Sequence, residues 1–150
     1  MQHSLSYADF TIKRSFKVPV SGLYEMFADQ KTKERWFKGP GSSESKHTMD
    51  FRVGGSEFNS GKFHDGITHV FKAVYYDIVP NNRIVYCYEM YLNKNRISVS
   101  LATLEFSPDG EGSKLVLHES GAFLDGYDTP QVREQGTKGL LDAIEKILNN

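Results

Sequence analysis

The hydrophobic residues of this chain repeat with two different periods, and the change between them constrains the fold more than any other feature. From residue 49 to residue 120, apolar and aromatic side chains alternate with polar ones in short runs, which is the period of a β-strand. After Gly121 the apolar residues recur at helical spacing as far as Leu148, with Asp128 or Thr129 as the N-cap. The sequence therefore predicts several strands followed by one long C-terminal helix.

The first part of the chain adds a strand and two short helices. Residues 9–18 alternate in the same way until Pro19, which ends the strand. Residues 23–36 then indicate two short helices with a break between Ala28 and Lys31. Turn residues at Asp65-Gly66, Pro80-Asn81-Asn82 and Asn93-Lys94 join the later strands as an antiparallel meander. This order predicts an α+β fold, with a curved antiparallel sheet of six or seven strands around the C-terminal helix.

Size and charge limit the function classes. A chain of 150 residues with 39% hydrophobic content is expected to form a single domain over 1–150. Its net charge of −1, without a basic run, argues against nucleic acid and anionic membranes as partners. No apolar segment is long enough for membrane insertion, and a single cysteine, Cys87, fits a reducing compartment, so we expect a cytoplasmic protein. The sequence leaves open whether the chain forms a homodimer.

The pattern also predicts which side chains face the helix. If Asn93-Lys94 forms a two-residue turn, the flanking strands pair in a register that turns one almost wholly apolar face inward. In the strand predicted over residues 67–79, Tyr76 shares the parity of Val74 and Ile78. We therefore expect Tyr76 rather than Tyr75 to point inward. The predicted inner face, which is also the candidate ligand-binding surface, comprises Tyr76, Tyr86, Tyr88, Met90, Val99, Leu101 and Leu117.

Glu119 shares the parity of Leu115 and Leu117, so it should point inward as well. A buried carboxylate needs a partner or becomes neutral. Two interpretations follow: a structural pairing with a Lys, Arg or Tyr hydroxyl at the strand end, or a direct contact with a ligand.

The C-terminal helix carries a stripe of small residues that includes Gly136 and Gly139. Each glycine costs a helix interior roughly 1 kcal/mol relative to alanine, so some feature should compensate. Either the helix packs very close to the sheet, or the missing side chains leave a void beneath it. We expect the void, with both glycines in its wall.

Signatures of catalysis and cofactor binding are absent from the sequence. There is no phosphate-binding loop, dinucleotide fingerprint, zinc-protease motif or nucleophile elbow. His64 and His69 flank the Asp65-Gly66 turn, where they could hold a metal with a third ligand. An exposed hairpin tip is the favoured interpretation, because Lys62 lies nearby and would disfavour a cation. No metal and no cofactor are predicted.

Several motifs resemble those of a known superfamily. They are Trp36-Phe37, Phe51-Arg52-Val53-Gly54-Gly55, Tyr75-Tyr76-Asp77-Ile78-Val79-Pro80, Arg83-Ile84-Val85, and Leu115-Val116-Leu117 followed by Gly121. The chain resembles the helix-grip (SRPBCC, START-like) superfamily of lipid-transfer domains, birch-pollen allergens and polyketide cyclases. Within it, the chain is most similar to the group named for the activator of the ninety-kilodalton heat-shock protein's ATPase.

Three functional hypotheses follow. The resemblance implies a non-catalytic module that holds an apolar or amphipathic small molecule between sheet and helix, with Glu119 as a polar contact. In such a fold Trp36 borders the mouth of the cavity, where it either gates the cavity or packs as ordinary core. The alternative is a cyclase-like or hydrolase-like enzyme in which Glu119 acts as general acid or base. A weaker alternative, from the family name alone, is a chaperone-interacting protein that uses its convex surface.

Overall fold

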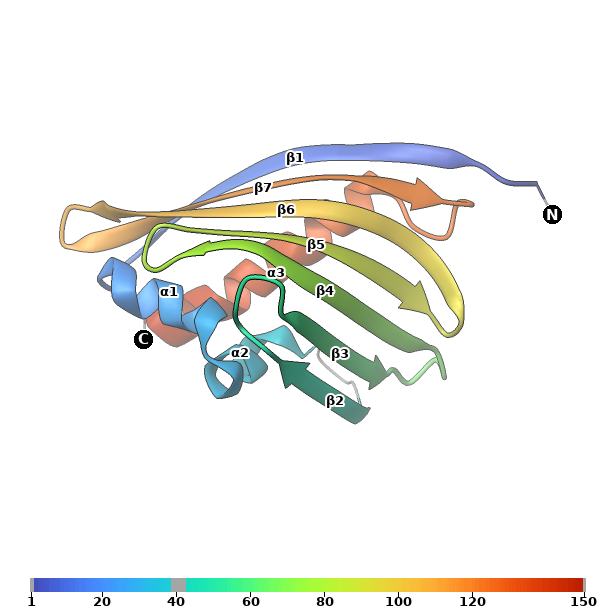
Figure 1. Ribbon diagram of the computed structural model, residues 1–150, viewed down its shortest axis with the longest axis horizontal. Helices are drawn as coiled ribbons and strands as arrows, with labels where there is room; N and C mark the ends of the chain where they lie inside the picture. Colours follow the sequence, from blue (N-terminus) through green and yellow to red (C-terminus); the bar gives the residue numbers. More distant parts are fainter. Residues whose placement is uncertain (1, 39–42, 150) are drawn as a thin grey trace.

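The computed structural model describes residues 2–38 and 43–149. Its elements confirm the predicted order of one strand, two short helices, a run of strands and a long helix (Figure 1). In chain order they are β1 (Leu5–Phe16), α1 (Val20–Ala28), α2 (Gln30–Phe37), β2 (Ser43–Met49), β3 (Ser56–Lys62), β4 (Thr68–Val79), β5 (Arg83–Leu92), β6 (Asn95–Asp109), β7 (Gly112–Leu124) and α3 (Pro130–Leu148).

The strands form one antiparallel sheet in the order β1-β7-β6-β5-β4-β3-β2, so β1 and β2 are its edges. The sheet curves, and the helices lie on its concave side (Figure 1). The α+β architecture expected from the sequence is therefore confirmed. Helix α3 begins as predicted, because the Thr129 hydroxyl accepts a hydrogen bond from the backbone N–H of Val132 at 3.1 Å.

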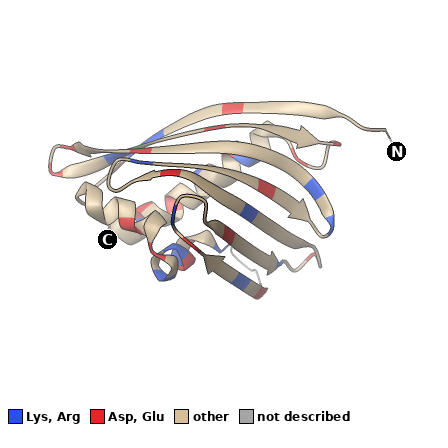
Figure 2. Ribbon diagram, in the orientation of Figure 1, with Lys and Arg blue, Asp and Glu red and all other residues tan. Residues whose placement is uncertain are grey.

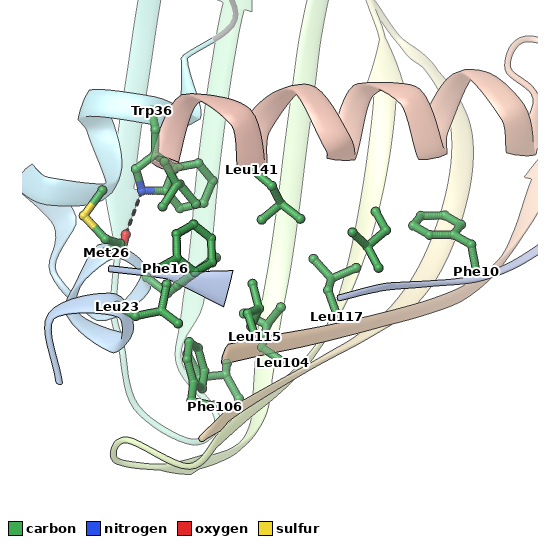
Figure 3. Packing of buried hydrophobic residues seen from close by; sticks show 14 of the residues in the cluster. Phe10, Phe16, Leu23, Met26, Trp36, Leu104, Phe106, Leu115, Leu117 and Leu141 are labelled. Carbon is green, nitrogen blue, oxygen red and sulfur yellow. Dashed lines mark hydrogen bonds between the residues drawn. The ribbon is translucent and has the colours of Figure 1, made fainter. Parts of the chain in front are cut away.

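The main core lies between this concave face and the helices (Figure 3). Leu141 and Ile144 of α3 are almost completely buried against it. Trp36 is buried too, and its indole N–H donates a hydrogen bond to the carbonyl oxygen of Met26 at 2.8 Å, which ties α2 to α1. Trp36 thus packs in the core, which is one of the two roles considered for it.

A β-bulge in β4 corrects the prediction for Tyr76. Tyr75 pairs with Tyr86, whereas Asp77 pairs with Val85, so Tyr76 is an extra residue in the ladder. Tyr75 points inward and is 2% exposed, while Tyr76 is 60% exposed. The prediction that Tyr76 faces inward was wrong because a bulge shifts the alternation by one residue.

A second bulge, in β6, corrects the prediction for Val99 and Leu101. Met90 pairs with Ser98 but Tyr91 pairs with Arg96, which leaves Ile97 as the extra residue. Every later residue of β6 therefore changes face. Val99 and Leu101 are each 42% exposed on the convex side. The inner positions are occupied instead by Ser98, Ser100, Ala102, Leu104 and Phe106.

The glycines of α3 also lie on the opposite side from the one expected. Gly136 and Gly139 are exposed, and an added Cβ at either would meet no atom within 4 Å. The helix turns Leu141 and Ile144 toward the sheet, because bulky apolar side chains gain more from burial than glycine does. Neither glycine lines a space beneath the helix, so both are removed from the candidate binding surface.

Replacing Gly121 or Gly139 by alanine should therefore change the free energy of unfolding in opposite directions. At Gly121 an added Cβ would lie 2.7 Å from the carbonyl oxygen of Val99, so Gly121→Ala should lower the free energy of unfolding by about 1–3 kcal/mol. Gly139→Ala meets open space in a helix and should raise it by about 0.5–1 kcal/mol. Urea denaturation of both variants measures the two changes. Equal effects would contradict these placements.

Candidate functional site

A row of aromatic side chains crosses the concave face from α2 to the centre of the sheet. We call Phe37, Phe71, Tyr86 and Tyr88 the aromatic row. The ring centroids of Phe37 and Phe71 are 4.9 Å apart, those of Phe71 and Tyr88 5.0 Å, and those of Tyr86 and Tyr88 5.9 Å. Met90 packs beside the row and is half-buried. The predicted inward positions of Tyr86, Tyr88 and Met90 are thus confirmed.

At one end of the row is the Glu57 cluster, formed by Glu57, Lys33, His47 and Tyr75. The Glu57 carboxylate is 2.8 Å from Lys33 Nζ and 2.7 Å from His47 Nε2, and it accepts a hydrogen bond from the Tyr75 hydroxyl. Burial alone would raise the pKa of Glu57. The Lys33 charge and the hydrogen bonds from His47, Lys33 and Tyr75 outweigh burial, so this pKa falls to about 2. Glu57 is therefore ionised throughout the physiological range.

Lys33, the cation of this cluster, touches aromatic rings as well as a carboxylate. Its ammonium lies 4.6 Å from the ring centroid of Phe37 and 5.9 Å from that of Phe71. Such contacts stabilise a desolvated cation. The lysine thus links the Glu57 cluster to the aromatic row, and α2 to strands β3 and β4.

At the other end of the row is the Glu119 cluster, formed by Glu119, Tyr88, Arg133, Ser98 and Asp128. The Tyr88 hydroxyl donates a hydrogen bond to Glu119 at 2.7 Å and accepts one from Arg133 at 3.0 Å. Arg133 also donates to Ser98 at 2.8 Å and to Asp128 at 3.0 Å. Its guanidinium is 3.8 Å from the Glu119 carboxylate.

Glu119 points inward as predicted and is 3% exposed. Burial raises its pKa, and the hydrogen bond from Tyr88 and the charge of Arg133 only partly oppose that effect. Its partners are a tyrosine hydroxyl and an arginine, as the structural interpretation expected. The raised pKa allows Glu119 to hold a proton closer to neutral pH than an exposed glutamate does.

Tyr86 lies between the two clusters. Burial raises the pKa of its hydroxyl well above 10, and Tyr88, Glu119 and Glu57 raise it further. Glu57 and Glu119 therefore raise the pKa of the same hydroxyl from opposite ends of the aromatic row. The two clusters face a common part of the interior.

Sequence reasoning found only part of this site. It identified Tyr86, Tyr88, Met90 and Glu119, and Leu117 lies on the same face but is 5% exposed within the core. It missed Lys33, Glu57, His47, Phe71 and Arg133. Alternation along β3 could have placed Glu57 inward, whereas no local pattern predicts that Lys33 and Arg133 reach the interior.

Among the side chains that the structure describes, no three His, Cys, Asp or Glu residues gather in a way that could hold a metal ion. His64 is exposed beside the hairpin turn, and His69 pairs with Gly61. Within 2–38 and 43–149, no helix has the length and apolar character needed to cross a bilayer.

Comparisons with known proteins agree with this architecture. The family profile of activator of Hsp90 ATPase homolog 1-like proteins matches residues 17–149. A structure of a protein from Rhizobium leguminosarum is 39% identical, with a TM-score of 0.93 and 99% of each chain covered. The Mll3558 protein from Rhizobium loti is 38% identical, with a TM-score of 0.87 and coverage of 95% of this chain and 98% of its own.

A more distant structure shares the fold alone. DynU16, described as belonging to the dynemicin biosynthetic locus, is 14% identical with a TM-score of 0.65, and the match covers 96% of this chain and 47% of that one. No protein with a curated description matches this chain in sequence.

Replacing the two buried glutamates by glutamine should alter the pH dependence of stability in opposite directions. The pKa of Glu57 is lowered from 4.5 to about 2, so its charge stabilises the fold above pH 4.5, and this contribution, on the order of 3 kcal/mol, is lost as the pH falls toward 2. The pKa of Glu119 is raised, so its contribution is complete below pH 4.5 and is lost as the pH rises through the raised pKa.

Glu57→Gln should therefore destabilise the protein more at pH 7 than at pH 3, whereas Glu119→Gln should be better tolerated at pH 7 than at pH 4. Unfolding free energies from urea titrations between pH 3 and pH 8 measure both trends. Parallel trends in the two variants would show that the clusters do not differ as described.

Proposed function

The chain belongs to the family of activator of Hsp90 ATPase homolog 1-like proteins, and we propose that it is a binding module for an apolar or amphipathic small molecule. The ligand lies on the concave face of the sheet, against the aromatic row and Met90 and below the first turns of α3. Its affinity comes mainly from the burial of apolar surface. The free Cys87 fits a reducing compartment, so we place the module in the cytoplasm.

One observation about Tyr86 carries this proposal. The raised pKa of its hydroxyl reflects burial deep in the protein, yet part of the side chain stays accessible. Tyr86 thus combines a desolvated hydroxyl with a side chain that is still partly accessible. Met90, on the same face of β5, is half-buried in the same way. These two residues support a ligand position next to the aromatic row.

The charges around this position favour an uncharged ligand. Lys33 and Glu57 neutralise one another, and Arg133 already contacts Asp128 and Tyr88. Neither cluster has surplus positive charge to attract an anion. The Tyr86 hydroxyl keeps its proton at pH 7, as an ordinary tyrosine does, and can donate it in a hydrogen bond. The ligand therefore carries an oxygen acceptor, such as a carbonyl, at the end that meets Tyr86.

Tyrosine-to-phenylalanine changes on the two faces of the sheet test this proposal. Native mass spectrometry of the purified protein, with a panel of lipids and neutral aromatic compounds, should detect a bound species. Tyr86→Phe should weaken binding by roughly fivefold, because it removes one hydrogen bond worth about 1 kcal/mol. Tyr76→Phe removes the same hydroxyl from the convex face and should leave the affinity unchanged. No bound species across the panel, or equal effects of the two changes, would refute the proposal.

Glu119 supports a second candidate, an enzyme that works in the same place. Burial raises the pKa of this carboxyl, and Tyr88 holds it by a 2.7 Å hydrogen bond. A carboxyl in such a setting suits a general acid, which protonates the ligand oxygen and then recovers its proton from water. The contact with a chaperone that the family name suggests stays a prediction, since no feature of the concave site favours it.

The Glu119→Gln variant distinguishes the proposed enzyme from a binding module without activity. With a ligand from the panel, the substitution should abolish any turnover and leave binding within about threefold, because Gln keeps the shape and accepts the Tyr88 hydrogen bond. Product formation and binding are measured on the same preparation by mass spectrometry. Turnover that survives the change would exclude Glu119 as the acid.

A further inference from the structure

The convex face of the sheet carries an apolar surface that no helix covers. Helices α1, α2 and α3 lie on the opposite side (Figure 1). We call Phe58, Val74, Tyr76, Cys87, Val99 and Leu101 the convex band. Tyr76 is 60% exposed and Val74 40%. In the register of the sheet, Val74 is opposite Cys87 and Cys87 is opposite Leu101, so the band is continuous across β4, β5 and β6.

The bulge in β6 contributes to this band, because it turns Val99 and Leu101 outward. Tyr76 points outward in regular alternation with Tyr75, on the same face as Val74. Contiguous apolar patches of this kind are uncommon on monomeric proteins and mark interaction surfaces. The same register that fills the interior with small and polar residues of β6 therefore leaves large apolar residues outside.

The band contains a shallow, open depression. The depression has a volume of about 520 Å³ and is lined by five members of the band, Phe58, Val74, Tyr76, Cys87 and Val99, together with Lys72 and Glu89. Tyr76 stands at this depression as a projecting ring, with more than half of its surface exposed. The surface thus offers both a projection and a recess that could receive one.

Three charged residues line the depression: Lys72, Glu89 and the buried Glu57. Lys72 and Glu89 have opposite sign and lie side by side on the convex face. Lys72 pairs with Glu89 across β4 and β5, and Figure 2 shows a basic band on β4 next to an acidic band on β5. Glu89 also accepts a hydrogen bond from Arg96 at 3.1 Å, and Lys72 lies 4.9 Å from the ring centroid of Tyr91. A twofold axis that lies in the plane of the interface and passes between these two side chains would bring Lys72 of one copy to Glu89 of the other, and the reverse.

We propose that the convex band is the interface of a symmetric homodimer, so that a second copy of this chain covers it. A surface with a projection, a recess and an adjacent pair of opposite charges is complementary to itself, which an isologous interface requires. Two sheets packed face to face through apolar side chains form such an interface. The assembly leaves the concave site free in each copy, so it is independent of the proposed ligand.

A glutamate in the convex band should separate the copies. Sedimentation velocity of the purified full chain should give twice the chain mass of 17.0 kDa at high concentration. Leu101→Glu should raise the dissociation constant of the dimer by at least roughly tenfold, because it buries an unpaired charge. Tyr76→Glu is a second variant at a more exposed position. Val132→Glu, at a 62% exposed apolar site on α3, is the matched control and should remain dimeric.

Charge exchange tests whether the occupant is a second copy. Lys72→Glu and Glu89→Lys should each weaken self-association, since each brings like charges together across the axis. Mixed in equal amounts, the two variants should associate with each other at least roughly tenfold more tightly than either does with itself. An interface at another place on the chain, or with a different protein, would not make the mixed variants associate more tightly than each variant alone.

Three results would overturn the proposal. The first is a wild-type protein that stays monomeric at every accessible concentration. The second is a dimer that Leu101→Glu and Tyr76→Glu leave intact while circular dichroism shows native folding. The third is a mixture of the charge variants that associates no better than its components.

Discussion

The arrangement of this protein depends on two residues that the ladders of its central strands leave unpaired, Tyr76 in β4 and Ile97 in β6. Each inserts one residue into a central strand and so exchanges the faces of the residues that follow. With a regular register, Val99 and Leu101 would lie inside and the serines of β6 outside. The bulge in β6 places Ser98 inside, where Arg133 donates a hydrogen bond to it. The polar end of the concave face and the apolar convex band thus have a common origin.

The concave face shows how neighbouring groups decide the behaviour of a buried carboxylate. Glu57 and Glu119 are equally inaccessible, yet their pKa values shift in opposite directions. Three groups converge on Glu57, and one of them, Lys33, carries a full charge at 2.8 Å. Glu119 has its closest contact with a neutral hydroxyl, and Arg133 remains 3.8 Å away. Desolvation is therefore overcome at one end of the aromatic row and prevails at the other.

The two faces of the sheet suit different tasks. The concave face has aromatic rings and compensated charges around the partly accessible Tyr86, which suits a small uncharged molecule. The convex face has aliphatic side chains and a projecting tyrosine, which suits a second protein surface. Because side chains alternate across a strand, one sheet can serve both purposes without a second domain.

Local sequence patterns indicated the order of the elements, the start of α3 at Asp128 or Thr129, and the inward direction of Glu119 on β7, whose pairing with β6 and with β1 is regular. These features depend on spacing within one segment, which the sequence displays directly. The inner face of β6, the outward position of Tyr76 and the exposure of Gly136 and Gly139 were decided only by the tertiary structure. So were the partners of the buried charges, since Lys33 meets Glu57, and Arg133 meets Tyr88, across long stretches of chain. A bulge or an ion pair between distant segments is selected by how those segments pack together, and no periodicity within either segment records that choice.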